Sequence, residues 1–369
     1  MAQDVEHPFA LRARQAAQPE LPGALSDLHL DIAVPEPGPG QVLVALRAAG
    51  LCGSDLHMHY RPAPEDRHGP VFGLATDPEV VPGHEPAGVV VELGADVHGL
   101  RVGERVAVHH MGGCGHCMHC RRGWDINCRD RWGVYGLDKP GAMQDYMVVR
   151  ARDCVRVPAT VSFEEAAYCT CGAGTGYLAL KRAGLGLGDR VAVVGLGPVG
   201  VAAAHFANLM GAQVTGLDLV GARREFAAQV AGCATIDAGT RHAAAEFLDA
   251  TGGDGADVVV ESSGSAKGRA LALDIAAVGA RVVCVGFADS ENVIDVQASI
   301  IQKQLDLRGA WMFPLPDLQD MLDDIAARQW SVAPLVTGRY DIEHAADAWA
   351  TFDRGGPGKT VLSWPETAS

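Results

Sequence analysis

Four closely spaced cysteines are the most concentrated metal-binding chemistry in the sequence. They follow the spacing C-x2-C-x2-C-x7-C and are Cys114, Cys117, Cys120 and Cys128. Four thiolates on one short loop can enclose a zinc ion tetrahedrally, with Zn–S bonds of about 2.3 Å. A closed shell leaves no position for a substrate, so the spacing predicts a structural zinc. Free buried thiols or two disulfides are the alternatives. His116 and His119 could compete as ligands but are more simply solvated side chains.

A second set of ligand types is spread along the chain. It begins with Cys52 in Cys-Gly-Ser-Asp-Leu-His, continues with His84 in Gly-His-Glu, and ends in Cys-Thr-Cys at 169–171. A catalytic zinc takes three protein ligands and keeps a fourth position open for the substrate. Cys52 and His84 supply a thiolate and an imidazole, and the third ligand would be Cys171 or Cys169. Each alone is more simply a core cysteine or a turn histidine, but their joint occurrence favours a catalytic site.

A glycine-rich loop follows an apolar β-type run at 190–194. Its pattern, G-x-G-x-x-G, is formed by Gly195, Gly197 and Gly200, with Pro198 and Val199 between the last two. The first glycine permits a tight turn, the second lets the backbone approach a pyrophosphate, and the third permits close packing of helix on strand. The pyrophosphate would lie at the N-terminus of the following helix, where unpaired N–H groups attract anions. The loop therefore predicts a dinucleotide site.

A carboxylate at the end of the next predicted strand bears on which dinucleotide is bound. Asp218 comes 18 residues after Gly200. A carboxylate at this point accepts hydrogen bonds from the ribose hydroxyls and repels a 2′-phosphate, so NAD is favoured over NADP. Arg223 and Arg224 follow closely and weaken that preference, although both are equally well explained as solvated cations on the next helix.

Two sequence patterns, one in each half of the chain, indicate the secondary structure that positions these groups. Residues 40–157 contain short β-branched runs separated by Gly and Pro, at 41–47, 87–92 and 105–108. From about residue 163, β runs alternate with Ala-rich helical stretches: strands at 190–194, 213–218, 257–261 and 281–286, and helices at 198–210 and 271–278. This alternation predicts a parallel, doubly wound sheet. Beyond 308 the alternation stops, and helices are predicted at 314–329 and 342–352.

Composition limits the class of protein. A chain of 369 residues with 48% hydrophobic and 20% charged residues suits two globular domains. The net charge of −15 disfavours nucleic acid and anionic membranes as partners. The apolar stretch at 191–210 is interrupted by glycines and polar residues and is no membrane span. No apolar secretory segment is visible at 1–23, so a cytoplasmic location is predicted, in which the ten cysteines would bind metal rather than pair.

These motifs, in this order, resemble those of the medium-chain, zinc-containing alcohol dehydrogenase family from about residue 40 to 364. The resemblance implies an α/β fold made of a GroES-like, β-rich catalytic domain and a Rossmann domain with a doubly wound parallel sheet. The catalytic domain would span 1–172, with a zinc lobe at about 110–130. The Rossmann domain would span 173–308, and 309–369 would return to the catalytic domain.

The resemblance also implies roles for single residues. Cys52, His84 and Cys171 would bind the catalytic zinc, since Cys-Gly-x-x-Thr-Gly-Tyr matches the family pattern at Cys171. Asp55 would orient His84, and Glu85 would be an alternative zinc ligand. Ser54 and His57 would form a proton relay. Contacts to the nicotinamide or pyrophosphate would come from Thr175, Gly286, Phe287 and Lys359, and the substrate pocket would be lined by His110, Trp311 and Phe287.

The predicted activity is hydride transfer between an alcohol and NAD, with two zinc ions per chain, one catalytic and one structural. The alternative is a polyol, amino-cyclitol or threonine dehydrogenase of the same chemistry. Features of that branch appear at 132–136 and 150–153. The sequence also departs from the family pattern at Gly53, where some relatives carry Arg. Cys52 and His84 are 32 residues apart, a longer interval than in the liver-type enzymes, and the interval contains an insertion at 61–81. A zinc-free quinone or enoyl reductase and a non-catalytic zinc- or NAD-binding protein are weaker alternatives. The expected partners are a small alcohol and further copies of the chain, as a homodimer or homotetramer.

Overall fold

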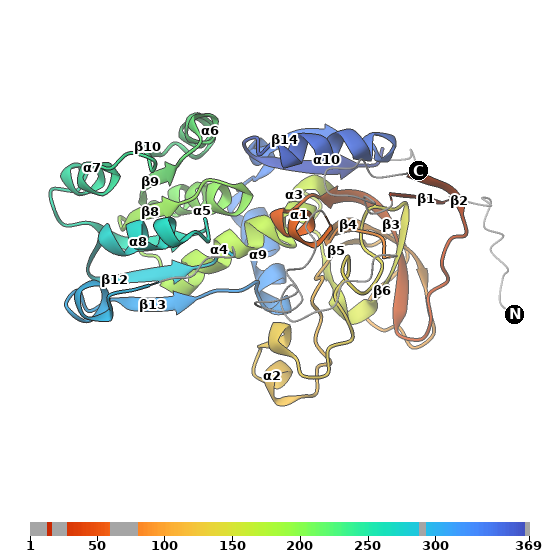
Figure 1. The fold of residues 1–369 in the computed structure, drawn as a ribbon. Coiled ribbons are helices and arrows are strands. Elements are labelled where there is room, and N and C mark those ends of the chain that lie inside the picture. The colour runs from red at the N-terminus through yellow and green to blue at the C-terminus, as the bar shows by residue number, and fades with distance from the viewer. Residues whose placement is uncertain (1–12, 17–27, 60–79, 288–292, 366–369) are drawn as a thin grey trace, which may run out of the picture.

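The computed structural model describes residues 13–16, 28–59, 80–287 and 293–365. Two large sheets, built from different parts of the chain, lie side by side (Figure 1). A third, two-stranded sheet pairs β1 (Ala13–Ala16) with β2 (Leu28–Ile32).

The first large sheet holds strands from both ends of the sequence. Its order is β14-β15-β3-β4-β5-β7, and β6 also pairs with β3. The strands are β3 (Gln41–Gly50), β4 (Glu85–Leu93), β5 (Arg105–Val108), β6 (Tyr146–Arg150), β7 (Cys154–Arg156), β14 (Val336–Tyr340) and β15 (Lys359–Ser363). Because β15 pairs antiparallel with β3, the last part of the chain is built into the sheet that the first part begins.

The second sheet is parallel and six-stranded, in the order β10-β9-β8-β11-β12-β13. Its strands are β8 (Arg190–Val194), β9 (Gln213–Asp218), β10 (Ala234–Asp237), β11 (Ala256–Glu261), β12 (Ala276–Cys284) and β13 (Asp306–Gly309). The chain adds strands on one side of β8 and then on the other, which confirms the predicted doubly wound sheet. The strand order changes direction between β8 and β11, and sheets of this kind bind ligands at the carboxyl ends of the strands at such a point.

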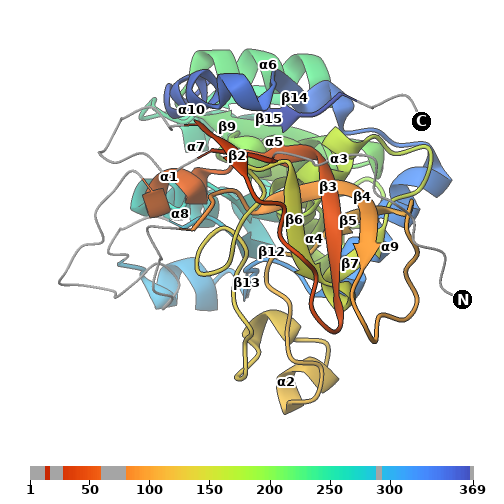
Figure 2. The same ribbon diagram turned by 90° about the vertical axis from the view of Figure 1, so that its right-hand side faces the viewer.

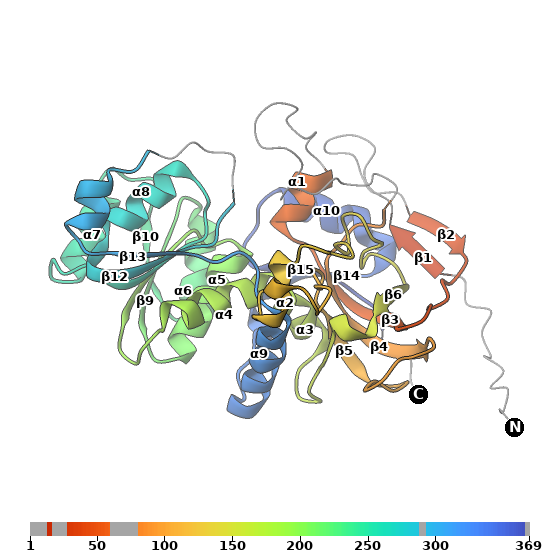
Figure 3. The same cartoon turned by 90° about the horizontal axis from the view of Figure 1, so that it is seen from below.

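Alternation along each strand explains why helices cover both faces of this sheet. Val191 and Val193 are buried in one apolar cluster, whereas Ala192 and Val194 are buried in another. The first cluster includes residues of α4 (Gly172–Ala183), α5 (Pro198–Leu209) and α6 (Gly221–Ala231). The second includes residues of α7 (Ala243–Ala250) and α8 (Ala266–Asp274). Figure 3 shows these two groups on opposite sides of the sheet.

The remaining helices connect or cover the two sheets. They are α1 (Gly53–His59), α2 (Met118–Arg121), α3 (Phe163–Cys169), α9 (Leu315–Arg328) and α10 (Ala345–Asp353), with short 3-10 turns at Asp125–Asn127, Ala151–Asp153, Ala333–Leu335 and Ile342–His344 and a π-helical turn at Val296–Ile301.

α3 starts at a capping box between Ser162 and Glu165. Glu165 Oε1 also accepts hydrogen bonds from Ser331 and the Val332 amide, which ties the returning chain to α3. None of the helices among the described residues is long and apolar enough to cross a membrane.

One predicted element differs from the structure. The helix expected at 271–278 ends at Asp274, and Ala276 already belongs to β12. The helix begins earlier than predicted because the Ser265 hydroxyl accepts from the Gly268 amide as an N-cap. It ends where Lys303 Nζ donates to the carbonyls of Leu273 and Asp274, a contact from 29 or more residues away.

Candidate functional site

The four clustered cysteines lie on a lobe that protrudes from the rest of the molecule beside α2 (Figures 1 and 2). Their Sγ atoms are 3.9 Å apart for Cys114–Cys120, 3.6 Å for Cys117–Cys120 and 3.8 Å for Cys117–Cys128. Zn–S bonds of about 2.3 Å in a tetrahedron place sulfurs about 3.8 Å apart, whereas a disulfide needs about 2.05 Å. The lobe therefore fits a zinc ion and excludes the disulfide alternative; all ten cysteines are unpaired.

Backbone amides of the lobe prepare the sulfurs for a metal. The amide of Cys114 donates to Cys128 Sγ over 3.2 Å, and the amide of Cys117 donates to Cys114 Sγ over 3.3 Å. The Cys120 backbone amide, with other donors, lowers the pKa of Cys117 to about 6. Because the thiolate is the form that binds zinc, the donors to Cys117 favour metal binding there, whereas burial raises the pKa of Cys120 and Cys128. His116 is exposed, with Nε2 3.8 Å from an Asp130 oxygen, and both residues lie close enough to Cys114 to share a metal ion with it.

A second group of ligand atoms converges from three separate elements. Cys52 follows β3, His84 precedes β4, and Cys171 lies in the turn between α3 and α4. Their ligand atoms, with one from Glu85, all lie within 4.8 Å of one another, and all four residues are buried. The Sγ atoms of Cys52 and Cys171 are 3.8 Å apart, again the edge of a zinc–sulfur tetrahedron. Two thiolates and an imidazole would leave a fourth position open.

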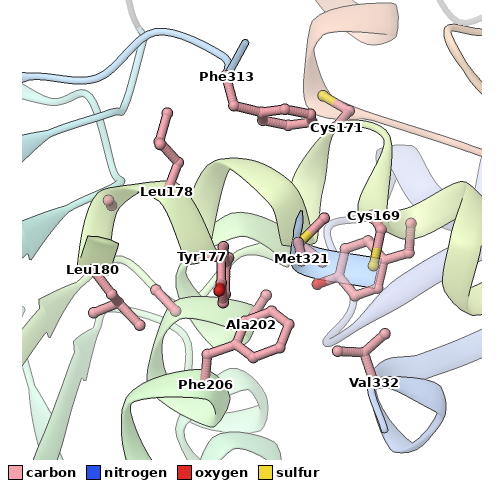
Figure 4. Close-up of a cluster of buried hydrophobic side chains, with 14 of the residues drawn as sticks. Cys169, Cys171, Tyr177, Leu178, Leu180, Ala202, Phe206, Phe313, Met321 and Val332 are labelled. Atoms are coloured by element: carbon pink, nitrogen blue, oxygen red, sulfur yellow. The ribbon is translucent and has the colours of Figure 1, made fainter. Parts of the chain in front are cut away.

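The structure distinguishes the two cysteines that the sequence left as alternatives. Figure 4 shows the sulfur atoms of Cys169 and Cys171 pointing away from each other, that of Cys171 toward Phe313 and that of Cys169 toward Met321 and Val332. Cys169 is completely buried among apolar side chains, and burial raises its pKa well above the ordinary range. Cys169 is therefore a core residue, and Cys171 is the cysteine in a position to bind metal.

Asp55 holds two members of the open site. Its Oδ1 lies 2.8 Å from His84 Nδ1, and its Oδ2 accepts from the Cys52 amide over 2.9 Å. With Nδ1 engaged, the other ring nitrogen of His84 is the one that faces the ligand group. Burial lowers the pKa of His84, but the charge of Asp55 and its hydrogen bond outweigh burial and raise it well above the ordinary value. Asp55 is thus placed to orient and polarise the imidazole.

The two thiols of the open site have pKa values that shift in opposite directions. The hydrogen bond between the sulfurs lowers the pKa of Cys52 well below its ordinary value, helped by His84, and raises that of Cys171 well above it. Ser54, a half-buried residue in the first turn of α1, has Oγ 3.2 Å from Cys52 Sγ. His57 lies on the same helix, but its side chain is outside the described residues, as is nearly all of the insertion at 61–81.

Glu85 makes a contact that the sequence did not predict. Its Oε1 accepts from Lys359 Nζ over 2.5 Å, both side chains are fully buried, and the ammonium lies 5.2 Å from the centre of the Tyr168 ring. Although burial disfavours the ammonium, the charge of Glu85 raises the pKa of Lys359. The contact of Lys359 with the cofactor stays a prediction; in the structure its ammonium is paired with the Glu85 carboxylate.

The three residues predicted to line the substrate pocket lie in two places. His110 is buried against His84, with ring centroids 4.7 Å apart, and burial lowers its pKa well below the ordinary range. Phe287 and Trp311 instead line a cavity at the carboxyl ends of β12 and β13. Met312, which the sequence analysis overlooked, links the two: its Sδ is 4.0 Å from Cys171 Sγ, and its φ of 52° is a left-handed conformation unusual for a side chain of this size. No local pattern signals such a residue.

The glycine-rich loop has the geometry that its pattern predicts. Gly195 has φ 92°, and a Cβ at Gly200 would lie 1.8 Å from the Gly195 carbonyl oxygen. A Cβ at Gly197, in contrast, would meet no atom within 4 Å, and Gly197, Pro198 and Val199 are all half-exposed at the start of α5. Ser262, not singled out from the sequence, donates to the Gly195 carbonyl over 2.8 Å. The loop thus leaves room for a ligand at Gly197 and none at Gly200.

The groups expected near the ribose are engaged with the backbone. Asp218 accepts from the amides of Leu196, over 2.6 Å, and Val220, over 2.8 Å, and its carboxylate is nearly buried. Arg223 donates to the Gly355 carbonyl and has Nη1 3.9 Å from Asp218. Arg224 pairs with Asp237, so it is a structural cation rather than a ligand contact.

The two other predicted cofactor contacts lie near the open site and the end of β12. Thr175 is buried in the first turn of α4, with its amide donating to the Cys171 carbonyl. Gly286 lies two residues after the end of β12 and passes so close to Gly264 that a Cβ would lie 2.2 Å from the Gly264 amide nitrogen. Gly286 also lines the cavity at the ends of β12 and β13.

Comparisons with known proteins agree with this geometry. A model described as "Alcohol dehydrogenase GroES-like domain" matches residues 38–159, and one described as "Zinc-binding dehydrogenase" matches residues 198–327. The uncharacterized zinc-type alcohol dehydrogenase-like protein YphC of Escherichia coli is 33% identical over 353 residues, which cover 94% of this chain and 98% of that protein. L-threonine 3-dehydrogenase of Escherichia coli is 29% identical over 335 residues, covering 90% and 95%. Among solved structures, alcohol dehydrogenase TADH from Thermus sp. ATN1 is similar with a TM-score of 0.82 and 27% identity, covering 96% of this chain and 99% of that one.

The chain therefore belongs to the medium-chain, zinc-containing alcohol dehydrogenase family. Its fold joins a GroES-like domain to a Rossmann-type parallel sheet, as the resemblance implied. Its class is that of oxidoreductases that act on alcohol groups.

Proposed function

We propose that the protein is a zinc-dependent dehydrogenase that transfers a hydride from the carbinol carbon of an alcohol to NAD, giving an aldehyde or ketone. The observation that carries the proposal is the convergence of Cys52, His84 and Cys171, from three separate elements, into a buried three-ligand group. A closed four-cysteine group on the lobe supplies a second, structural site. Two complete ligand sets disfavour a zinc-free quinone or enoyl reductase, which would need neither.

The residues of the open site have distinct tasks in this reaction. When bound there, a zinc ion lowers the pKa of a coordinated alcohol. Asp55 holds the His84 ring and the Cys52 amide, and so fixes two ligands relative to each other. The Ser54 hydroxyl, 3.2 Å from Cys52 Sγ, is placed to take the alcohol proton. His57, on the same helix, would pass that proton to solvent.

The glycine loop and Asp218 support NAD as the hydride acceptor. The pyrophosphate would lie over Gly197, where an added Cβ would meet no atom within 4 Å, at the N-terminus of α5. The Asp218 carboxylate ends β9 beside this loop, and its charge would repel a 2′-phosphate. The cavity-lining Phe287 and Trp311 would lie on the nicotinamide side of the dinucleotide site.

Threonine, polyol or cyclitol oxidation is the second candidate, with the same zinc and NAD chemistry. The similarity to L-threonine 3-dehydrogenase over 90% of the chain supports it. A screen of NAD reduction across simple alcohols, polyols, cyclitols and β-hydroxy amino acids, with purified full-length protein, tests both candidates. Rates confined to the last three groups would favour the second.

Metal analysis of the purified chain is the direct test of the site assignment. We expect about two zinc ions per chain, one in each ligand group. One zinc per chain would indicate a structural lobe on a protein without catalysis, and none would contradict the proposal.

We further propose that the protein acts as a homodimer or homotetramer in the cytoplasm, on a small-molecule alcohol and without nucleic acid or membrane partners. β13 lies at the edge of the parallel sheet, where a second copy could extend it. Ten unpaired cysteines suit a reducing compartment. Light scattering of the pure protein tests the oligomeric state.

Replacing Ser54 by Ala should lower kcat by about 10²- to 10⁴-fold, because the reaction then lacks its first proton acceptor. The zinc content should stay at the wild-type value, since Ser54 supplies no ligand atom to the open site. Steady-state rates together with metal analysis measure both. Ser54→Thr, which keeps a hydroxyl, is the control and should retain most of the activity. A wild-type rate in Ser54→Ala would contradict the relay.

Two glycines of the nucleotide loop should respond differently to Ala. At Gly197 the added methyl meets no protein atom, so the free energy of unfolding should stay unchanged while NADH binding weakens about tenfold or more. At Gly200 the methyl would lie 1.8 Å from the Gly195 carbonyl oxygen, so the fold itself should lose about 1–3 kcal/mol. Thermal unfolding and NADH fluorescence titration separate the two effects. Unimpaired NADH binding in Gly197→Ala would place the pyrophosphate elsewhere.

A further inference from the structure

A cavity of about 380 Å³ lies between the cysteine lobe and the parallel sheet. Trp124 and Asn127 of the lobe form one wall, and the ends of β12 and β13, with Phe287 and Trp311, form another. Arg182, at the end of α4, and Arg269, on α8, complete it. We call it the arginine cavity. Figure 3 shows the lobe with α2 beside α4.

The arginine cavity adjoins the open zinc-ligand group. Its wall residue Trp311 is followed directly by Met312, whose Sδ is 4.0 Å from Cys171 Sγ. On the opposite side, α4 begins next to Cys171 and carries Arg182 eleven residues later, about 16 Å along the helix axis. A molecule that reacts at the open site could therefore extend along α4 into the cavity.

The charge in the cavity is opposite to that of the protein as a whole. The chain carries a net charge of −15, yet none of the described residues that line the cavity is acidic. Arg269 has a carboxylate nearby, with Nε 3.7 Å from Glu261, and it also donates to the Gly286 carbonyl. Arg182 differs: within the described part of the chain, no carboxylate lies at ion-pair distance from it.

An aromatic ring holds the Arg182 guanidinium in place. The guanidinium carbon lies 5.1 Å from the centre of the Trp124 ring, a cation–π contact between α4 and the lobe. A guanidinium fixed in this way loses little freedom when it binds a ligand, and its planar pair of N–H donors matches a carboxylate. An arginine that has no acidic partner among the described residues, in a cavity beside the reaction site, is a candidate binding group for an anion.

We propose that the arginine cavity binds the carboxylate of a hydroxy-acid substrate, with Arg182 as the residue that determines this specificity. The inference rests on the proposed dehydrogenase function and names the class of alcohol on which it acts. The reacting hydroxyl lies at the open site, the carbon chain passes Trp311, and the carboxylate meets Arg182. The aromatic walls suit an extended carbon chain.

The inference is tested with a series of ω-hydroxy acids of roughly four to eight carbons, because α4 separates Arg182 from the open site. Each acid is compared with the diol of the same length. In the wild-type protein, kcat/KM should favour the acid over the diol by about 10- to 100-fold at the best length, the value of a charge-assisted hydrogen bond pair. In Arg182→Met that ratio should fall to about one, mainly because KM for the acid rises. Arg182→Lys should restore part of the ratio. Equal ratios in wild type and Arg182→Met, or a wild-type preference for diols, would overturn the inference.

The chain offers a matched control for this substitution. Arg328, on α9, lies over the Trp330 ring at the same 5.1 Å, but it is exposed and outside the cavity. Arg328→Met should therefore leave the ratio of acid to diol unchanged. Zinc content and thermal unfolding of each variant check that the fold persists. The phosphate monoesters of the same diols are tested as substrates in the same way. A preference for them over the acids would contradict a carboxylate site.

Equilibrium binding separates this inference from the proposed function. Calorimetric titration of the best ω-hydroxy acid into the protein with NADH present requires no turnover. Binding that Arg182→Met abolishes, in a protein that oxidises no alcohol, would support the cavity and refute the dehydrogenase. Alcohol oxidation without Arg182-dependent binding of the acid would refute the cavity alone.

Discussion

Cys171→Ala is expected to lose one zinc ion per chain and to lower kcat/KM by at least about a thousandfold, because two ligands no longer hold the metal that activates the alcohol. The thiol of Cys171 lies 3.8 Å from that of Cys52, at the distance of two ligands on one zinc. The four cysteines of the lobe are untouched, so the second zinc should remain. Mass-spectrometric metal analysis of the purified variant, together with NAD reduction rates, measures both effects.

Cys169→Ala is the matched control, two residues away in the same turn. The Cys169 sulfur points into the core beside Met321 and Val332 (Figure 4). Removing it should cost about 1 kcal/mol of packing and leave both zinc ions and the activity in place. If Cys169→Ala lost the zinc and Cys171→Ala kept it, the ligand assignment would be reversed.

This pair shows what the sequence could and could not settle. The spacing of Cys169 and Cys171 offers two ligands of the same type, and only the resemblance of Cys-Gly-x-x-Thr-Gly-Tyr to the family pattern favoured the second. The physical reason is visible in the fold. α3 ends at Cys169 and α4 starts after Cys171, so the turn between them directs the two side chains to opposite sides.

Local sequence patterns predicted the features whose residues lie close together in the sequence. The strand at 190–194, the glycine loop and the Cys114–Cys128 lobe were predictable because turn, helix start and ligand spacing are all set within about fifteen residues. The contact of Asp55 with His84, 29 residues apart, was predicted only through the resemblance. The end of α8 was misplaced because Lys303, a distant residue, caps it.

The parts that escaped prediction depend on long-range contacts. Lys359 and Glu85 are 274 residues apart and meet only because β15 pairs with β3 beside β4. Arg182 and Trp124 likewise come together through the packing of the lobe on α4. No periodicity or motif in either segment encodes these partners, so their chemistry could be assigned only from the fold.

Lys359→Met is the second substitution with a large expected effect, this time on stability. It leaves the fully buried carboxylate of Glu85 without the ammonium that lies 2.5 Å away. Glu85 Oε2 already has no hydrogen-bond partner among the described residues. Breaking a buried ion pair on one side costs about 3–5 kcal/mol, and we expect a loss of this size in the free energy of unfolding, measured by urea denaturation.

Two further variants establish that the buried charge, rather than the lost side chain, is the cause. In the double variant Glu85→Gln/Lys359→Met no charge is left unpaired, so most of the stability should return. Lys181→Met removes an exposed lysine that pairs with Asp317 and Asp320, and should cost at most about 1 kcal/mol. A double variant as unstable as Lys359→Met would show that packing of the lysine stem, and not compensation of the Glu85 charge, holds β15 against the open site.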